Sequence, residues 1–301
     1  MNISVVITSR NRRDSLRQTL ASLEAQTVAP HEVIVVDDGS TDGTGEMLAA
    51  AFPDVVYVRR EQHGGPAAAR NQGIRAATGD LIAFTDDDSI PPPRWLEGHL
   101  HHFDDARVGA VGGPSIPPDP NFFDQVDIVR YADLLHDQLR RIERLTGWEG
   151  LGTGNMTVRR AIFDEVGYFD EAFLTGSDPE FTRRVVRLGG YALIVDPSLV
   201  VAHMKWHTLR SYLRTRFHRG CGAVLTDLKE GSLSWRRFLP VPNLLLGWRE
   251  WRTFRRRFGG GALTFLRYWA LFFLVRWVTV AGRAYYYWTA GRPYRRRDVE
   301  Q

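Results

Sequence analysis

The sequence predicts an α/β protein with a mixed sheet flanked by helices and a helical C-terminal extension. Apolar runs of strand length alternate with helical segments in the first half of the chain, which is typical of strands joined by helical crossovers. Acidic residues directly follow two of these runs, at the strand ends where ligands bind in open α/β sheets. From about Arg210 the sequence becomes helical, arginine-rich and aromatic. We therefore expect two domains, covering residues 1–210 and 211–301.

The expected elements follow one another in an order that places helices on both faces of the sheet. Early strands are predicted at Ile3–Thr8, Glu32–Val36, Val55–Val58 and Leu81–Thr85, and later strands at Asn155–Val158, Tyr191–Val195 and Leu199–Ala202. Helices are predicted around Leu16–Leu23 and Met47-Leu48, and at Pro66–Ala77, Phe122–Leu145 and Asp178–Leu188.

The bulk composition is that of an ordinary globular protein, with 301 residues, 44% hydrophobic and 25% charged. The net charge is +4, and arginine clusters at 255–257 and 295–297 predict an anionic partner such as lipid, nucleic acid or polyphosphate. Cys221 is the only cysteine, which excludes an intrachain disulfide and a thiolate metal cluster. The N-terminal segment has the pattern of a strand and not of a signal peptide, so we expect a reducing compartment.

Three consecutive aspartates stand at the end of one predicted strand. Asp86, Asp87 and Asp88 come directly after the apolar run Leu81–Thr85. Because their charges repel one another, a cation would stabilise them, and carboxylate oxygens suit Mg²⁺ or Mn²⁺. Taken alone, a solvated acidic turn explains this segment equally well.

A second acidic turn follows the strand Glu32–Val36. Asp37 can accept hydrogen bonds from a base or a ribose, while Ser40 or Thr41 can cap the next helix. A calcium loop would need glutamate where Ala49 stands, so that interpretation fails. A turn without any ligand is the alternative.

Glycines and polar residues mark the starts of two further helices. Gly64-Gly65 allows a ligand to approach closely, and Arg70 in the following helix can bind phosphate or a base edge. Asp178, at the start of the helix Asp178–Leu188, is either a simple helix cap or a general base aimed into the cleft. The segment Gly150–Gly154 looks like a dinucleotide loop, but no clear strand precedes it, so we reject that interpretation.

Taken in order, these segments resemble the family 2 glycosyltransferases, which are inverting enzymes with the GT-A fold. The resemblance covers roughly residues 1–210 and rests on several linked motifs. They are Ser4–Thr8, Val35–Asp42, Ala69–Gly73, Phe84–Asp88, Gly154–Arg160, Phe169–Phe173 and Gly176–Glu180 with Arg184 beyond. The resemblance implies transfer of a sugar from a UDP-, GDP- or dTDP-sugar to a hydroxyl of a glycan, lipid or small-molecule acceptor, with divalent Mg or Mn.

The resemblance also implies a role for individual residues. Asp178 is the implied catalytic base. Asp86, Asp88 and His203 are the implied metal ligands, with His207 as the alternative histidine. The implied nucleotide and donor site comprises Thr8, Arg10, Asp37, Asp38, Arg70, Asp86 and Asp87. The implied acceptor loop comprises Gly154, Asn155 and Glu180.

Two departures from the family pattern qualify these expectations. The family usually has glutamate before the catalytic aspartate, and this chain has Ser177, which we expect to leave Asp178 more acidic because a neighbouring carboxylate is missing. The Gln-x-x-Arg-Trp motif of processive polymerases is absent from the sequence, which favours single addition.

The segment from Tyr268 to Gly282 is apolar except for Arg276. Arg276, Thr279 and Arg283 fall on one helical face, and tryptophans and tyrosines flank the segment as in interfacial helices. We expect this helix to bind an anionic membrane surface and to hold the protein as a peripheral protein on the inner face of the cell membrane, with no nucleic acid partner. Packing on the catalytic domain, or a dimer seam, is the alternative.

Two other functions remain to be weighed. A sugar nucleotidyltransferase would share the α/β architecture, but it resembles Gly-x-Gly-Thr-Arg after the first strand with a nearby lysine. This chain has Ser9-Arg10-Asn11-Arg12 there, and no lysine before Lys205. A non-catalytic scaffold that binds nucleotide-sugars is kept open by Ser177.

Overall fold

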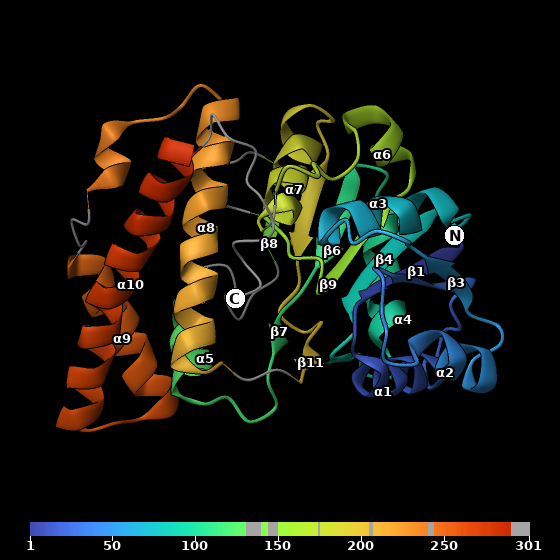
Figure 1. Ribbon diagram of the computed structural model, residues 1–301, viewed down its shortest axis with the longest axis horizontal. Coiled ribbons are helices and arrows are strands. Elements are labelled where there is room, and N and C mark those ends of the chain that lie inside the picture. The colour runs from blue at the N-terminus through green and yellow to red at the C-terminus, as the bar shows by residue number, and fades with distance from the viewer. Residues whose placement is uncertain (131–139, 144–149, 174, 205–206, 240–243, 290–301) are drawn as a thin grey trace. The chain divides into compact units, whose positions relative to one another are not determined.

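The computed structural model describes residues 1–130, 140–143, 150–173, 175–204, 207–239 and 244–289, and it forms two units (Figure 1). The first unit comprises Met1–Pro120, Ala132–Ala172 and Ser177–Lys205. The second comprises Asn121–Tyr131, Phe173–Gly176 and Trp206–Gln301. The sequence predicts a single boundary at residue 210, whereas the second unit also takes two short segments from earlier in the chain.

A mixed eight-stranded sheet forms the centre of the first unit. Its strands, in spatial order, are β3 (Val56–Arg59), β2 (Glu32–Asp37), β1 (Ile3–Ser9), β4 (Leu81–Asp86), β9 (Asn155–Arg159), β6 (Val108–Gly112), β10 (Ala192–Val195) and β8 (Arg140–Ile142). Strands β1 to β4 are mutually parallel, while β9 is antiparallel to both of its neighbours. The carboxyl ends of β1, β2 and β4 therefore meet at one edge of the sheet.

Helices cover both faces of this sheet because the side chains of each strand alternate between two cores. Val6 joins the core beside α3 (Pro66–Ala76), whereas Val5 and Ile7 join the opposite core. The first core also includes α6 (Ala161–Val166) and α7 (Ser177–Arg187), and the second includes α1 (Arg13–Glu24), α2 (Thr44–Ala51), α4 (Trp95–Leu100) and η1 (His101–Asp104).

We call the edge where β1, β2 and β4 end the acidic edge, because Asp86, Asp87 and Asp88 lie there. A small second sheet brings a distant segment to it. Its strands are β5 (Ser89–Ile90), β11 (Val201–His203) and β7 (Ser115–Ile116), with β11 in the middle. The pairing sets His203 opposite Ser89, directly after the three aspartates. The register of a three-residue strand thus decides which side chain reaches the acidic turn.

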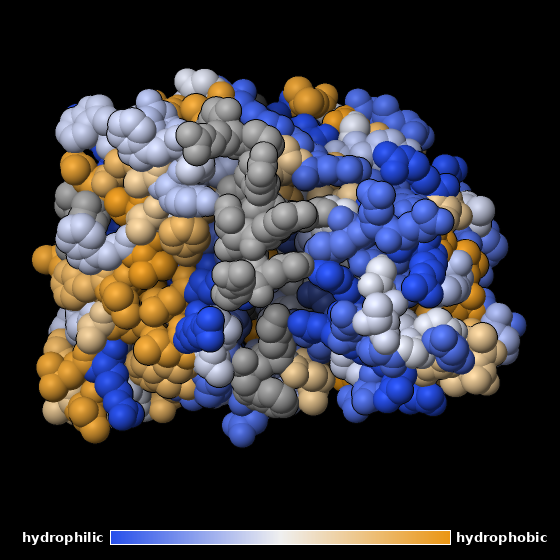
Figure 2. All heavy atoms as spheres, viewed as in Figure 1, coloured by the Kyte–Doolittle hydropathy of each residue, from blue (hydrophilic) through white to orange (hydrophobic). Residues whose placement is uncertain are grey.

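The second unit is helical. It contains α5 (Phe122–Arg130), α8 (Leu209–Lys229), η2 (Trp235–Phe238), α9 (Leu244–Phe258) and α10 (Ala262–Thr289). Helices α8 and α10 approach at glycines: a Cβ on Gly282 would lie 2.1 Å from the Phe217 carbonyl oxygen, and one on Gly220 would lie 2.2 Å from that of Thr279. Apolar side chains gather on the surface over these helices (Figure 2).

One expectation from the sequence needs correction. The single helix predicted at Phe122–Leu145 is wrong: α5 is described from Phe122 to Arg130, but Arg140–Ile142 forms a strand at the edge of the main sheet, where Ile142 is buried. Residues 131–139 and 144–149 of that prediction lie outside the described residues. On α10 the backbone at Thr279 and Arg283 packs against Gly220 of α8, so the helical face that carries these two residues points into the second unit.

Candidate active site

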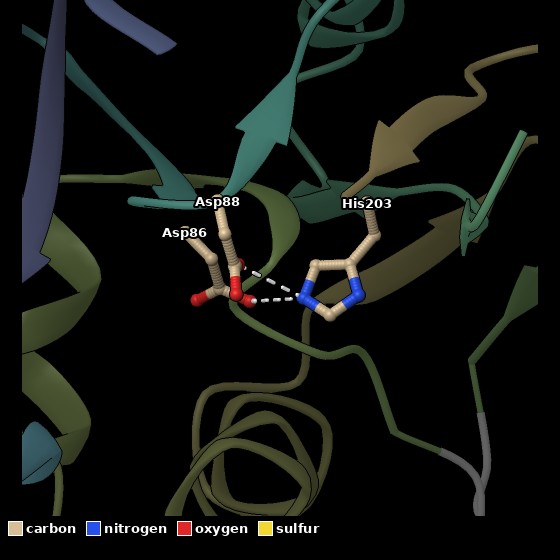
Figure 3. A group of neighbouring side chains, drawn as sticks. All are labelled: Asp86, Asp88 and His203. Atoms are coloured by element: carbon tan, nitrogen blue, oxygen red, sulfur yellow. Dashed lines mark ion pairs between the residues drawn. The ribbon is translucent and has the colours of Figure 1, made fainter. Parts of the chain in front are cut away.

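Asp86, Asp88 and His203 point toward one another at the ends of β4 and β11 (Figure 3). The Nε2 atom of His203 lies 3.0 Å from Oδ1 of Asp88 and 4.0 Å from Oδ2 of Asp86. One ligand atom from each residue lies within 4.8 Å of the others. His207 belongs instead to the second unit, where its Nδ1 lies 2.6 Å from Oδ1 of Asp124.

Arg12, from the turn between β1 and α1, is the main counter-charge of Asp87 and a second one, after His203, of Asp88. Its guanidinium donates to both Asp87 and Asp88. Burial raises the pKa of Asp87 to about 6 despite Arg12 and the Ser9 hydroxyl. Burial also disfavours the charged form of Asp88, but His203 and Arg12 together outweigh it and lower the pKa of that carboxyl. Asp88 is thus held ionised, as a metal ligand must be.

The chemistry of the donor atoms at this edge fits a divalent cation. Two carboxylates and one imidazole are an oxygen-rich set that suits Mn²⁺ and, with fewer protein ligands, Mg²⁺. The absence of a side chain at Gly154 leaves room for the Asp86 carboxylate, because a Cβ there would lie 2.8 Å from Oδ2 of Asp86. Only glycine leaves Asp86 in its observed position.

The segment Gly150–Gly154 proves to be the connection between the acidic edge and Asp178. A Cβ on Gly150 would lie 2.7 Å from Cβ of Pro179, and one on Gly152 would lie 3.5 Å from Oδ2 of Asp178. The backbone N–H of Thr153 donates to the same oxygen at 3.3 Å. The glycines rejected as a dinucleotide loop therefore allow one chain segment to contact both the start of α7 and Asp86.

Asp178 lies inside the first turn of α7, which begins at Ser177, and not at the preceding cap position. Burial raises the pKa of Asp178, while the charge of Arg70 and two backbone N–H groups oppose the shift. Burial thus acts in the opposite direction to the effect expected from Ser177. A carboxylate with a raised pKa at a partly exposed position is suited to accepting a proton.

Arg70 lies at the acidic edge, whereas Glu180 is held in an ion pair within α7. Nη2 of Arg70 lies 3.8 Å from Oδ1 of Asp86, so α3 brings a cation to the acidic edge. Both carboxylate oxygens of Glu180 accept from Arg184, at 2.7 and 3.0 Å, and Arg184 also donates to the Tyr168 carbonyl oxygen. We infer that Glu180 positions α7 and does not itself contact an acceptor.

Asp37 and Asp38, at the end of β2, are both buried and hydrogen-bonded, mostly to segments beyond the turn that follows. Asp37 accepts from the Ser40 N–H and the Tyr57 hydroxyl, each at 2.7 Å. Asp38 accepts from the N–H groups of Gly64 and Gly65, both at 2.8 Å, and pairs with Arg60 and His63. Asp37 thus fixes the turn after β2 and contacts β3, and Asp38 fixes the segment that precedes α3.

The remaining residues expected from the sequence fall into two groups. Thr8 lies opposite Asp86 in the register of β1 and β4, and Arg10 is exposed one residue beyond β1, so both lie at the acidic edge. Asn155 is 2% exposed, and its amide bonds Trp95, His99 and the carbonyl oxygens of Pro114 and Leu199. The side chain of Asn155 is therefore an internal anchor, and the place of Asn155 in an acceptor loop stays a prediction.

Sequence reasoning missed Arg12, Tyr57 and His63. The arginine stands in Ser9-Arg10-Asn11-Arg12, directly after the first strand, so its position at the carboxyl end of the sheet is a signal that was available. The contacts of Tyr57 and His63 join segments that are remote from Asp37 and Asp38 in sequence, and no local pattern indicates them.

Comparison with known proteins gives a consistent result. The model of "Glycosyl transferase family 2" matches residues 4–167. "Glycosyltransferase AglE" of Haloferax volcanii is 28% identical over 74% of this chain and 73% of its own length. "Pre-mycofactocin glycosyltransferase" of Mycobacterium tuberculosis is 31% identical over 74% of this chain, which spans about half (47%) of that relative.

Solved structures show the same architecture. A mannosyltransferase from Pyrobaculum calidifontis, determined in complex with GDP-Man and Mn²⁺, aligns over 95% of this chain and 87% of its own, with a TM-score of 0.66 and 20% identity. At that identity the likeness establishes the GT-A-like fold alone.

Proposed function

Because this chain belongs to glycosyltransferase family 2 and is a glycosyltransferase, we propose that it is a metal-dependent, inverting enzyme. It transfers a sugar from a nucleoside-diphosphate sugar to an acceptor hydroxyl. The observation that carries the proposal is the convergence of Asp86, Asp88 and His203, with Gly150–Gly154 linking them to Asp178. The Mn²⁺ and GDP-Man in the mannosyltransferase of similar fold support the same kind of donor site.

Asp86, Asp88 and His203 would hold the divalent cation. The cation would supply charge neutralisation for the diphosphate leaving group. Arg70 would add a second positive charge beside Asp86, close to the nucleotide. Thr8, Arg10, Asp37, Asp38 and Asp87 complete the proposed donor site, with Arg12 holding Asp87 and Asp88 in place.

Asp178 would remove the proton from the acceptor hydroxyl. Its raised pKa increases its strength as a base, and the Thr153 N–H fixes the direction of one oxygen. Attack by the acceptor on the face opposite the leaving group would invert the anomeric carbon. The Asp178 proton transfer is worth typically 10²–10⁴-fold in rate.

We keep single addition, and a peripheral location on the inner face of the cell membrane, as parts of the proposal. The absence of the Gln-x-x-Arg-Trp motif supports single addition. The one helix among the described residues that is long and apolar enough to cross a membrane, Ala262–Thr289, supports membrane contact by length and composition. A glycan, lipid or small-molecule acceptor fits this location.

A donor screen tests the catalytic proposal. The full chain is titrated calorimetrically with UDP, GDP and dTDP, each with Mn²⁺ and with EDTA, and donor hydrolysis is then measured for sugars of the nucleotide that binds. We expect one nucleotide to bind only with the metal. Equal affinity in EDTA for every nucleotide would contradict a metal-dependent site.

A further inference from the structure

Helices α9 and α10 of the second unit are rich in arginine, poor in acidic residues, and expose many large apolar side chains. Between Leu244 and Thr289 the sequence has eight arginines and a single acidic residue, Glu250. Glu250 accepts from the Tyr268 hydroxyl at 3.0 Å, inside the unit. Many large apolar side chains, in contrast, are exposed along α10 and on the first half of α9.

The outer surface of α10 is a stripe with helical spacing. It comprises Leu263, Leu266, Phe273, Leu274, Trp277 and Trp288, which are 41–82% exposed. With Ala270 and Ala281 between them, these positions recur at intervals of three or four residues from Leu263 to Ala281, and Trp288 follows two helical turns later. Only 22% of the most apolar window of this helix is buried.

Helix α9 extends the same surface. It runs antiparallel to α10 across the turn Gly259–Gly261, with Trp251 5.1 Å from Phe265 between ring centroids and Gly247 against Phe272. At its start Leu244, Leu245 and Trp248 are 51–84% exposed. We call all these exposed side chains of α9 and α10 the apolar face; Figure 2 shows apolar residues gathered over this part of the unit.

An arginine collar borders this face at the turn between the helices. It consists of Arg252, Arg255, Arg256 and Arg257 at the end of α9 and Arg267 near the start of α10, all exposed. No carboxylate of the described residues Leu244–Thr289 other than Glu250 is available to neutralise it. The collar therefore carries positive charge that a binding partner would balance.

Two further arginines of α10, Arg276 and Arg283, reach into the unit. The Nε atoms of Arg276 and Arg283 are buried, and Arg276 lies over the Phe272 ring at 5.0 Å. Nearby, Arg216 of α8 forms an ion pair with Asp127 of α5. Charges that face inward while an apolar stripe faces outward are typical of helices in contact with lipid, and tight glycine contacts such as Gly220 and Gly282 are typical of their packing.

We propose that the apolar face and the arginine collar dock the second unit face-on onto a bilayer that contains anionic lipid. Hydrocarbon would cover the apolar face, and the collar would bind lipid phosphates. A second copy of this chain is a poorer occupant, since it would present the same acid-poor, arginine-rich surface. This inference rests on the proposed membrane location and names the surface and the lipid class that produce it.

Vesicle co-sedimentation of the full chain tests the proposal, with phosphatidylcholine vesicles and with vesicles containing one part phosphatidylglycerol to two parts phosphatidylcholine. Each basic residue near an anionic surface contributes about 1 kcal/mol, or about fivefold in partitioning. The triple variant Arg255→Gln/Arg256→Gln/Arg257→Gln is therefore expected to bind the anionic vesicles about a hundredfold more weakly. The matched triple Arg17→Gln/Arg94→Gln/Arg107→Gln, on exposed positions of the first unit, is expected to bind like the parent.

The apolar face is tested separately with Phe273→Ser/Trp277→Ser, and Leu188→Ser on the first unit is the control for an exposed apolar residue. We expect at least about tenfold weaker partitioning to both vesicle types, with nucleotide binding unchanged. The proposal is overturned if the parent does not bind anionic vesicles, if either test variant binds like its control, or if Phe273→Ser/Trp277→Ser instead dissociates a dimer in light scattering. Nucleotide affinity measured on the same samples reports on the proposed catalytic function independently.

Discussion

The two units of this protein handle charge in opposite ways. In the first unit the sheet core is apolar and the charged groups collect at the carboxyl ends of the strands, where each buried carboxylate has counter-charges or N–H groups around it. In the second unit exposed arginines border an apolar outer face, and the Nε atoms of Arg276 and Arg283 are buried. The first unit thus collects its charges at a ligand-binding edge, whereas the apolar face of the second unit is the surface that we propose to contact lipid.

The largest expected effect is at the acidic edge of the first unit. Asp88→Asn keeps the size of the side chain and removes its charge, so metal-assisted nucleotide binding should fall at least about a hundredfold, or below detection. Calorimetry with the nucleotide and Mn²⁺ measures this, with Asp54→Asn as the control at an exposed carboxylate. Unchanged affinity and metal dependence in Asp88→Asn would remove Asp88 from the site.

Asn155 should affect stability and not ligand binding. Asn155→Ala leaves the Trp95 indole N–H and the Leu199 carbonyl oxygen without their Asn155 partner, while the Pro114 carbonyl oxygen keeps the Val201 N–H. Each buried polar group left unpaired costs about 1–3 kcal/mol, so we expect a loss of several kcal/mol in the free energy of unfolding. Denaturant unfolding measures it. Near-native stability together with loss of acceptor turnover would restore Asn155 to the acceptor site.

In the second unit, stability should depend most on the close contact between α8 and α10. A methyl group on Gly282 would overlap the Phe217 carbonyl oxygen, so Gly282→Ala should destabilise the helical unit by about 1–3 kcal/mol. Gly261→Ala is the matched control, because a Cβ there meets nothing within 4 Å. Thermal unfolding followed by circular dichroism compares the two variants. Equal melting temperatures would mean that α8 and α10 do not pack as closely as described.

The smallest expected effect is on nucleotide binding, where alanine at Gly154 should be harmful and alanine at Gly152 should not. Gly154→Ala should push Asp86 from its place and weaken metal-assisted nucleotide binding about five- to tenfold, equivalent to about 1 kcal/mol. Gly152→Ala introduces only an ordinary contact, 3.5 Å from Asp178, and should bind nucleotide like the parent. If both variants bind equally well, Asp86 does not depend on Gly154.

Much of the first unit follows from sequence because its signals are local. An apolar run that ends in acidic residues predicts both a strand and a ligand edge, and β4 with Asp86 and Asp88 has that form. The strand β8 could not be predicted, since Ile142 is buried only by pairing with β10, far along the chain. The anchoring role of Asn155 likewise depends on partners from three remote segments.

The sequence also could not predict which face of α10 points into the second unit. Its periodicity separates a face with Arg276, Thr279 and Arg283 from an apolar face, but both faces are consistent with burial. Which face points inward is decided by the glycine contacts with α8, and these are visible only in three dimensions.

Asp178 carries the central claim, and two properties of one variant test it. Burial raises the pKa of Asp178, so its ionised form is disfavoured in the folded protein, and a neutral side chain of the same shape relieves that cost. Asp178→Asn should therefore melt no lower than the parent. In the parent, turnover should fall with decreasing pH at a value above the ordinary range of aspartate, because the base must be ionised to accept a proton.

The most direct measurement is the turnover of Asp178→Asn set beside its donor affinity. The proposed role predicts turnover lower by about 10²–10⁴-fold, with donor affinity and melting temperature preserved, since the base contacts the acceptor hydroxyl and not the nucleotide. Turnover within a few-fold of the parent would contradict it and place the catalytic base elsewhere.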